Sequence, residues 1–281
     1  MTGIYDERIC ELGEGALWHP ARCQYFWFDI LGRRLLSRHM DEAREWRFDR
    51  MASAAGWVDA DHLLIAHEHG LGLLDLTSGD LEPVAAIEAE KPETRSNDGR
   101  ADRHGGFWFG TMGKQAEQDA GAVYRYYRGE IRKLVDEITI PNAICFSPDG
   151  ASAYYADTSV RKIWVQSLDR QGWPAGEARL FVDCAPLDLS PDGAVTDSEG
   201  ALWVACWGAG AVTRFGPDGR QMDSLSVGGR HCSCPAFGGV AMDEMLVTTA
   251  CEGIDHPDAA QGVTYLLVPG VKGLPEPRVI L

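Results

Sequence analysis

Short apolar runs separated by turn residues repeat along the chain, and helical periodicity is nearly absent. Each repeat starts with a Gly or Asn at a turn, enters a short apolar run, turns again and continues into a run rich in aromatic residues. The repeats start at residues 15–18, 56–58, 99–101, 142–144, 193–195 and 238–240. Successive starts are 41, 43, 43, 51 and 45 residues apart, which matches one four-stranded blade and exceeds an ankyrin or TPR repeat. The sequence therefore predicts an all-β fold, a six-bladed β-propeller with a central channel.

The second run of each repeat is nearly continuous in apolar residues, as in residues 24–28 and 202–205. Such runs are typical of strands that are buried on both faces. A third strand follows in each repeat, and Pro-Asp-Gly or Ser-Gly-Asp turns separate neighbouring runs. Residues 4–10 alternate like a strand but have no blade of their own. We expect residues 1–281 to form one domain, in which residues 4–10 close the ring beside the C-terminal repeat.

The charge of the chain limits its partners. The 281 residues include 42 acidic and 26 basic side chains, a formal net charge of −16 at pH 7. A surface of this sign repels nucleic-acid phosphates and anionic lipid headgroups, so we expect neither as a partner. The N-terminal residues show no basic start followed by an apolar run, and no apolar stretch reaches the ~20 residues that span a bilayer. We expect a cytoplasmic protein, and a monomer because no apolar stripe indicates a subunit interface.

Polar residues stand at the start of four inner strands. Glu14, Asp98, Asn142 and Asp192 occupy equivalent places in different blades, so we expect them to converge at one end of the channel, where propellers bind ligands. Asp or Asn before Gly is also typical of a plain tight turn. That alternative is weaker for Glu14, a poor turn former, and for Asn142, which follows Pro141 into an apolar run. Because converging buried carboxylates repel one another, the pattern favours a divalent cation held by oxygen ligands.

Four motifs occur in a fixed order along nearly the whole chain. They are Leu-Gly-Glu-Gly-Ala-Leu-Trp at 12–18, Arg-Ser-Asn-Asp-Gly-Arg at 95–100, Phe-Trp-Phe-Gly-Thr-Met at 107–112 and Pro-Asp-Gly at 191–193. The combination is specific where each motif alone would be weak, and it resembles the SMP-30/gluconolactonase family, to which regucalcin-type and sugar-acid lactonases belong. The resemblance implies a six-bladed propeller that binds one divalent cation and hydrolyses a sugar lactone to the aldonic acid. One departure is Ala16, where many members have Pro.

The resemblance also implies roles for single residues. It implies metal ligands at Glu14, Asn142 and Asp192, and substrate-binding residues at Arg95, Asn97 and Glu117. The loop 113–120 admits another alignment at Glu117. A carboxylate beside the cation can accept a proton from the attacking water, so Asp192 is also the candidate general base. An alternative interpretation of Arg95 is a surface ion pair with Glu90 or Glu93.

The implied ligands, two carboxylates and one amide, suit several cations. We expect calcium first, with magnesium, manganese and ferrous iron also suited and zinc not excluded. A cation would polarise the lactone carbonyl and lower the pKa of an attacking water. Two rival sites stay open. His67, Glu68 and His69 stand at a strand end and could bind zinc or copper, and Cys232 and Cys234 could bind metal or form a disulfide.

Other functions remain as alternatives. No Gly-x-Ser-x-Gly elbow and no glycine-rich phosphate loop is present, so covalent catalysis is not expected. A metal-dependent phosphotriester or aryl ester hydrolase is one alternative, although the polar Arg95 and Asn97 favour a sugar, on whose face Trp18 or Trp207 could stack. A non-catalytic calcium-binding propeller is another, which predicts a blocked channel or activity that survives the loss of Asp192. Pentonolactones and hexonolactones both remain open as substrates.

Overall fold

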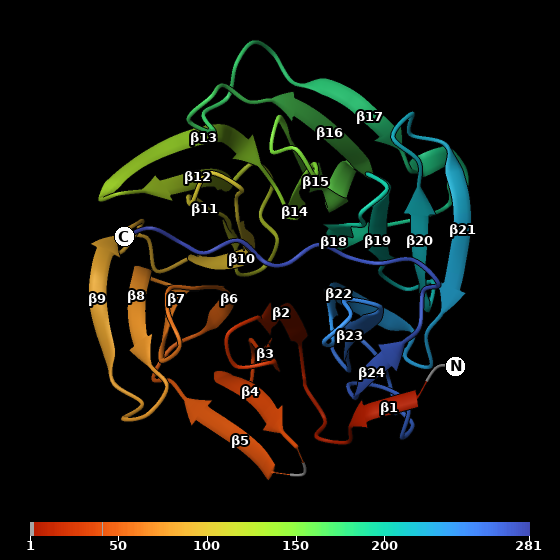
Figure 1. Ribbon diagram of the computed structural model, residues 1–281, viewed down its shortest axis with the longest axis horizontal. Helices are drawn as coiled ribbons and strands as arrows, with labels where there is room; N and C mark the ends of the chain where they lie inside the picture. The colour runs from red at the N-terminus through yellow and green to blue at the C-terminus, as the bar shows by residue number, and fades with distance from the viewer. Residues whose placement is uncertain (1–2, 41) are drawn as a thin grey trace.

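The computed structural model describes residues 3–40 and 42–281. Six four-stranded sheets are arranged in a ring (Figure 1), and neighbouring strands pair in the antiparallel direction. Two short 3-10 turns, η1 (Thr158–Val160) and η2 (Ala185–Leu187), are the only helical elements in this part of the chain. Neither they nor any other described segment is a helix long and apolar enough to cross a membrane. The predicted all-β, six-bladed β-propeller is confirmed.

Each sheet is one blade, with its strands in order from the channel to the rim. Blade 1 comprises β2 (Gly13–His19), β3 (Gln24–Asp29), β4 (Arg34–His39) and β5 (Glu42–Arg47). Blade 2 comprises β6 (Ala52–Trp57), β7 (His62–His67), β8 (Gly70–Asp75) and β9 (Leu81–Ala86). Blade 3 comprises β10 (Thr94–Ala101), β11 (Phe107–Gly113), β12 (Gly121–Tyr127) and β13 (Glu130–Ile138).

The second half of the chain continues the same order. Blade 4 comprises β14 (Pro141–Phe146), β15 (Ser152–Asp157), β16 (Lys162–Ser167) and β17 (Arg179–Asp183). Blade 5 comprises β18 (Pro191–Thr196), β19 (Leu202–Cys206), β20 (Ala211–Phe215) and β21 (Gln221–Ser226). Blade 6 comprises β22 (His231–Gly238), β23 (Glu244–Ala250), β24 (Thr264–Leu267) and, at its rim, β1 (Gly3–Asp6).

Blade 6 therefore combines both ends of the sequence. β1 pairs with β24, with Gly3 opposite Leu266. The sequence predicts that residues 4–10 close the ring as a strand, and the observed strand is shorter, because β1 ends at Asp6. Because β1 comes from the start of the chain and β22 to β24 from its end, their pairing joins the last blade to the first.

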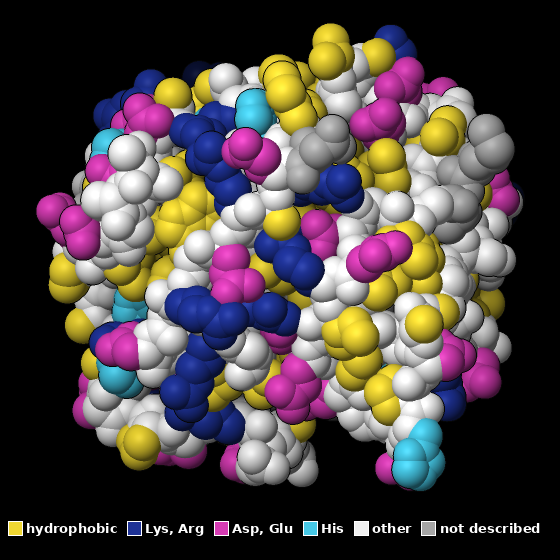
Figure 2. Space-filling model, turned by 90° about the horizontal axis from the view of Figure 1, so that it is seen from below, with side chains coloured by type: hydrophobic (Ala, Val, Ile, Leu, Met, Phe, Trp, Pro, Cys, Tyr) yellow, Lys and Arg dark blue, Asp and Glu magenta, His cyan; other side chains and the backbone are white. Residues whose placement is uncertain are grey.

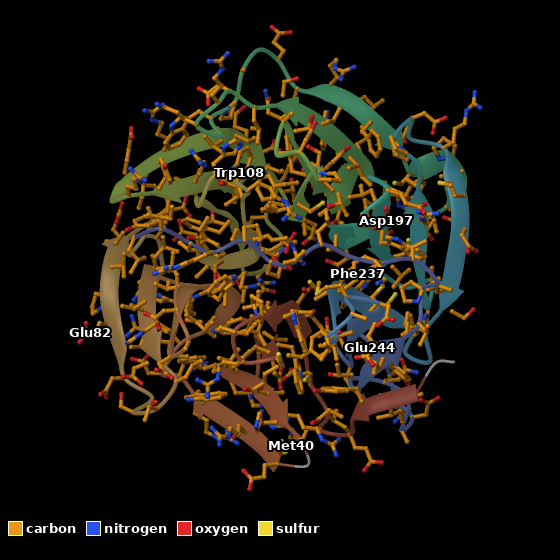
Figure 3. The ribbon with its side chains drawn as sticks, viewed as in Figure 1. Met40, Glu82, Trp108, Asp197, Phe237 and Glu244 are labelled. Atoms are coloured by element: carbon orange, nitrogen blue, oxygen red, sulfur yellow. The ribbon has the colours of Figure 1, made fainter. Side chains whose placement is uncertain are left out.

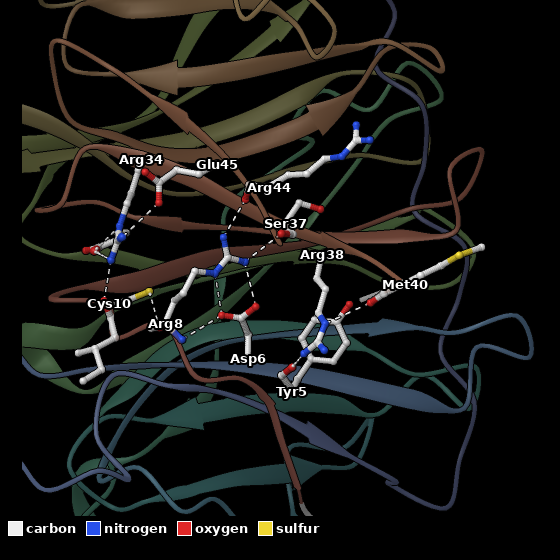
Figure 4. A network of polar contacts seen from close by, with 12 residues as sticks. Tyr5, Asp6, Arg8, Cys10, Arg34, Ser37, Arg38, Met40, Arg44 and Glu45 are labelled. Carbon is white, nitrogen blue, oxygen red and sulfur yellow. Dashed lines mark hydrogen bonds and ion pairs between the residues drawn. The ribbon is translucent and has the colours of Figure 1, made fainter. Parts of the chain in front are cut away.

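Hydrogen bonds from two arginines connect the residues after β1 with blade 1 (Figure 4). Arg8 Nη2 donates to Asp6 Oδ2 at 2.9 Å and to Ser37 O at 2.8 Å. Arg34 Nη2 donates to Ile9 O at 2.6 Å. Figure 2 shows this edge of the ring, where Lys and Arg side chains form a band with Asp and Glu side chains beside them. Charge-assisted bonds of this kind are stronger than neutral ones, so they support the closure of the ring.

Burial falls from the channel to the rim. The inner strands β2, β14, β18 and β22 are buried along their whole length, whereas the outer strands β5 and β21 are mostly exposed. The second strands β3 and β19 are fully buried, as their apolar runs predict. In Figure 3, Trp108 and Phe237 lie inside the ring, and Met40, which is 84% exposed, lies at its rim.

The C-terminal residues after β24 cross one face of the ring (Figure 1). Lys272 O accepts from Ser198 N at 2.8 Å, and Glu276 O accepts from Trp57 Nε1 at 2.9 Å. The Glu276 carboxylate forms a buried ion pair with Arg100. These contacts lie where inner strands end, so the segment covers the end of the channel that is opposite to the strand starts.

Candidate functional site

A cavity of about 400 Å³ lies at the other end of the channel, where the inner strands begin. Five of the six predicted site residues line it, and all five are buried. They are Glu14 from blade 1, Arg95 and Asn97 from blade 3, Asn142 from blade 4 and Asp192 from blade 5. The fold therefore brings together side chains that are up to 178 residues apart in the sequence, from 14 to 192.

β-bulges determine where these side chains point. Each of the six inner strands shifts its register against the second strand of its own blade near its start. The shift lies between Glu14 and Leu17 in blade 1 and between Asn142 and Cys145 in blade 4. A bulge interrupts the alternation of a strand and redirects the side chains beside it. The irregular strand starts thus give the channel end its polar lining while the rest of each inner strand packs in the core.

Glu14 and Asp192 form a buried pair of carboxyl groups. Their side chains are 6% and 4% exposed, and both line the cavity. Within residues 3–40 and 42–281, neither takes part in an ion pair with a basic side chain. Burial raises the pKa of both groups, and the charge of Asp98 raises both further. Two carboxylates in this arrangement are stabilised by a cation between them.

Asp98, the fourth polar residue at a strand start, is buried and does not line the cavity. Its Oδ2 accepts from Ile144 N at 2.7 Å and its Oδ1 from Gly99 N at 2.8 Å. Burial raises its pKa to about 6. Asp98 therefore links blade 3 to blade 4 through backbone amides, which is a structural role.

Hydrogen bonds join Arg95 and Asn97 to Asn142. Arg95 Nη1 donates to Asn97 Oδ1 at 2.7 Å, and Asn97 Nδ2 donates to Asn142 Oδ1 at 2.9 Å. Arg95 is 8% exposed and forms no ion pair with the described residues, so the alternative of a surface pair with Glu90 or Glu93 is wrong. Burial lowers the pKa of Arg95, and nearby carboxylates oppose that shift. Arg95 is a buried cation in the cavity wall, with donors left for a ligand.

Glu117 does not line the cavity. Its Oε2 accepts from Gln115 N at 3.0 Å, and Gln115 and Ala116 form part of the wall. The carboxylate of Glu117 therefore shapes the loop that carries Gln115. The sequence did not single out Gln115, because the motifs leave the alignment of the loop 113–120 open.

One wall of the cavity carries an aromatic face. Trp207 lines the cavity and stacks on His231, with ring centroids 4.3 Å apart and an interplanar angle of 19°. His231 Nδ1 donates to the backbone oxygen of Glu252 at 2.9 Å, and Glu252 also lines the cavity. Trp18 packs in the core against Tyr25, with centroids 4.7 Å apart. Of the two tryptophans considered from the sequence, Trp207 is the one placed for a ligand.

The rival metal sites are not assembled. His67 Nδ1 accepts from His69 N at 3.1 Å, His69 Nδ1 lies 2.9 Å from Arg50 Nη1, and Glu68 pairs with Lys114 at 2.5 Å. All eight cysteines are free, so those at 232 and 234 form no disulfide. Among the described residues, no three His, Cys, Asp or Glu side chains are placed to hold an ion together. The candidate set in the cavity combines two carboxylates with an amide.

Comparison with known sequences identifies the family. The sequence model described as SMP-30/Gluconolactonase/LRE-like region matches residues 12–251. The chain belongs to this family. A putative sugar lactone lactonase of Rhizobium meliloti is 41% identical over 278 residues, which cover 96% of this chain and 94% of that protein. An L-arabinolactonase of Azospirillum brasilense is 36% identical over 251 residues, which cover 86% of this chain and 82% of that protein.

Two solved structures have the same fold as this chain. The crystal structure of a calcium-binding protein, regucalcin, from Agrobacterium tumefaciens matches with a TM-score of 0.96 and 39% identity, covering 99% of this chain and 97% of that one. A luciferin-regenerating enzyme that is 22% identical matches with a TM-score of 0.92, covering 100% and 99% of the two chains.

Proposed function

We propose that this protein is a metal-dependent lactonase that hydrolyses a sugar lactone to the aldonic acid. The observation that carries the proposal is the pair of buried carboxyl groups, Glu14 and Asp192, which face a cavity beside a buried guanidinium, Arg95. The named relatives support the reaction, since a putative sugar lactone lactonase and an L-arabinolactonase are 41% and 36% identical to this chain.

Glu14, Asn142 and Asp192 would hold the cation. The donor set fits a divalent ion because two buried carboxyl groups form no ion pair with the described basic residues, and Asn142, which carries an amide oxygen, lines the same cavity. Oxygen ligands suit calcium first, and magnesium, manganese, ferrous iron or zinc are the alternatives. The calcium-binding regucalcin that matches at 39% identity supports this order.

The residues around the cation would divide the reaction among them. A bound divalent cation polarises a carbonyl oxygen and lowers the pKa of a nearby water. Asp192 accepts the proton as the water attacks the carbonyl carbon, and returns a proton to the ring oxygen when the bond between that oxygen and the carbonyl carbon breaks. Arg95 and Asn97 hold the sugar hydroxyls, and Glu117 contributes by holding the loop of Gln115. The products of water and lactone are then the hydroxy acid alone.

The cavity also bears on the alternatives. Its wall includes Arg95, Asn97 and Gln115, whereas an aryl ester or phosphotriester would favour an apolar wall. A non-catalytic calcium-binding propeller predicts a blocked channel, and the cavity of about 400 Å³ at the strand starts is open space for a small ligand. Both observations favour a sugar lactone.

The proposed activity is tested by proton release from a panel of pentonolactones and hexonolactones, using metal-stripped protein with single divalent ions added back. We expect ion-dependent turnover, and a loss of about 10³-fold or more in kcat for Asp192→Asn, because the proton acceptor is removed. Asp218→Asn, in an exposed turn, is the matched control and should retain full activity. Absence of turnover on every lactone, with an ion still bound, would leave the non-catalytic calcium-binding propeller as the explanation.

A further inference from the structure

Five residues at the cavity form one continuous chain of hydrogen bonds. Arg95 Nη1 donates to Asn97 Oδ1 at 2.7 Å, and Asn97 Nδ2 donates to Asn142 Oδ1 at 2.9 Å. Asn142 Nδ2 donates to Thr158 Oγ1 at 2.8 Å, and Thr158 Oγ1 donates to Pro191 O at 2.6 Å. The chain begins at the candidate substrate-binding guanidinium and ends at the residue before the candidate base.

The two ends of this chain fix the direction of every bond in it. A guanidinium can only donate and a backbone carbonyl can only accept. Arg95 therefore turns Oδ1 of Asn97 towards itself, which leaves Nδ2 of Asn97 to face Asn142. At the other end, Pro191 O takes the hydroxyl proton of Thr158, which leaves Thr158 Oγ1 as an acceptor. Asn97 therefore presents a donor to Asn142, and Thr158 presents an acceptor. Oδ1 of Asn142 must face Asn97 and Nδ2 must face Thr158, so these two partners determine the orientation of the amide.

This orientation decides whether Asn142 can bind a cation. Only the amide oxygen is a metal ligand, and it has two lone pairs, one of which accepts from Asn97. The second lone pair is available at the cavity wall. If the Asn142 amide were flipped, its Nδ2 would face Nδ2 of Asn97, and both groups are donors. Its Oδ1 would face the Thr158 hydroxyl, whose proton is already donated to Pro191 O. The flip would therefore lose both side-chain bonds of Asn142.

We propose that Thr158 is a positioning residue, whose hydroxyl keeps Oδ1 of Asn142 directed at the cation site. This role rests on the proposed function, because it presumes that Asn142 is a metal ligand. The hydroxyl is not needed for the local turn. The backbone of η1 is held by Thr158 N donating to Ile140 O at 3.1 Å and by Arg161 N donating to Thr158 O at 3.2 Å.

Three substitutions separate orientation from packing. Thr158→Val keeps the side-chain shape and removes the acceptor of Asn142 Nδ2, whereas Thr158→Ser keeps the hydroxyl. Thr196→Val is the matched control, because the Thr196 hydroxyl donates to Phe146 O at 2.7 Å but lies at the opposite end of its inner strand. Thr158→Ala removes the same acceptor without the added methyl group, and it replaces Thr158→Val if that variant does not fold.

Calcium binding to the metal-stripped proteins is measured by isothermal titration calorimetry without substrate. We expect Thr158→Val to weaken binding about 10-fold or more, the usual cost of removing a residue that orients a metal ligand. Thr158→Ser and Thr196→Val should bind within about twofold of the wild type, because the orienting hydroxyl is retained or is remote. Lactone hydrolysis by Thr158→Val should need more ion for half-maximal rate and should recover kcat at saturating ion.

The outcomes distinguish the two claims. Wild-type protein that binds no divalent ion, or binds it equally well after Asn142→Ala, contradicts the proposed metal site itself. If Asn142→Ala loses the ion but Thr158→Val binds it as the wild type does, the metal site stands and the positioning role of Thr158 is overturned. An equal loss in Thr158→Val and Thr196→Val also overturns it, because a general loss of packing would then explain both.

Discussion

Buried charged side chains in this protein fall into two groups according to their partners. Asp102, Asp197 and Glu276 each pair with a buried or nearly buried arginine. Glu14 and Asp192 have no such partner among the described residues, although they are buried to a similar degree. A buried carboxylate without a positive partner is costly. Asp98 is also buried without an ion pair to a described residue, but backbone amides donate to both of its oxygens. At the residue scale, the unpaired carboxyl groups that line the cavity therefore mark the candidate site.

The sequence predicts some members of this site and not others, for a physical reason. Residues at the strand starts or in the family motifs could be named, because the repeat places them: Glu14, Arg95, Asn97, Asn142 and Asp192. The residues that were missed lie in the connections between strands, whose path depends on neighbouring blades: Gln115, Thr158 and Glu252.

His67 gives a prediction about pH. It is buried at the end of β7, and burial, with the charge of Arg50, lowers its pKa from 6.5 to about 4. The folded state therefore holds the neutral imidazole, and its contribution to stability is full above pH 6.5 and is lost as the pH falls towards 4. One such proton changes the free energy of unfolding by up to about 1.4 kcal/mol per pH unit. The free energy of unfolding, measured with urea between these pH values, should depend less steeply on pH in His67→Asn than in the wild type.

The control for this prediction is His39→Asn, at an exposed position near the end of β4. That variant should keep the pH dependence of the wild type. Parallel pH profiles for His67→Asn and the wild type would show that His67 is not held neutral by the fold.

At the scale of elements, the six bulged inner strands explain how one repeat gives both a core and a site. A regular strand would send alternate side chains into the spaces between blades. The register shift near each strand start releases the first residues from this alternation, as it does at Glu14 and Asn142. The period of the sequence predicts where the strands begin, but a bulge depends on the pairing with the next strand and cannot be seen in the apolar pattern alone.

Gly15 permits the bulge in blade 1. Its φ is 56°, and a Cβ at this position would collide with the backbone oxygen of Ser53 on β6. Gly129 has a φ of 79° and open space around it, so it is a matched control. We expect Gly129→Ala to lower the free energy of unfolding by about 1 kcal/mol, the cost of the left-handed conformation. Gly15→Ala should cost about 3 kcal/mol or more, because the backbone must also shift.

Unfolding by urea, together with calcium titration of the folded variants, measures this difference. Gly15→Ala should also bind calcium more weakly, since Glu14 is the neighbouring residue. Equal stability losses at the two glycines, with unchanged calcium affinity, would contradict the role of this bulge.

At the scale of the whole molecule, the propeller has two unlike ends. The repeat predicts six blades because its period is regular, and it predicts that polar strand starts meet. It does not predict that the C-terminal residues cross the opposite end, because Arg100 and Glu276 are 176 residues apart and the chain after β24 has no strand pattern. With that end covered, the substrate is expected to reach the candidate site through the cavity at the strand starts.

We propose that this cavity holds a divalent cation between Glu14, Asn142 and Asp192. Anomalous diffraction from a crystal of the protein soaked with Mn²⁺ would test this site, because the signal locates the ion without any assumption about activity. We predict a single strong peak bounded by the carboxylate oxygens of Glu14 and Asp192 and by Oδ1 of Asn142. An empty cavity, or a peak beside His67 and His69 instead, would contradict it.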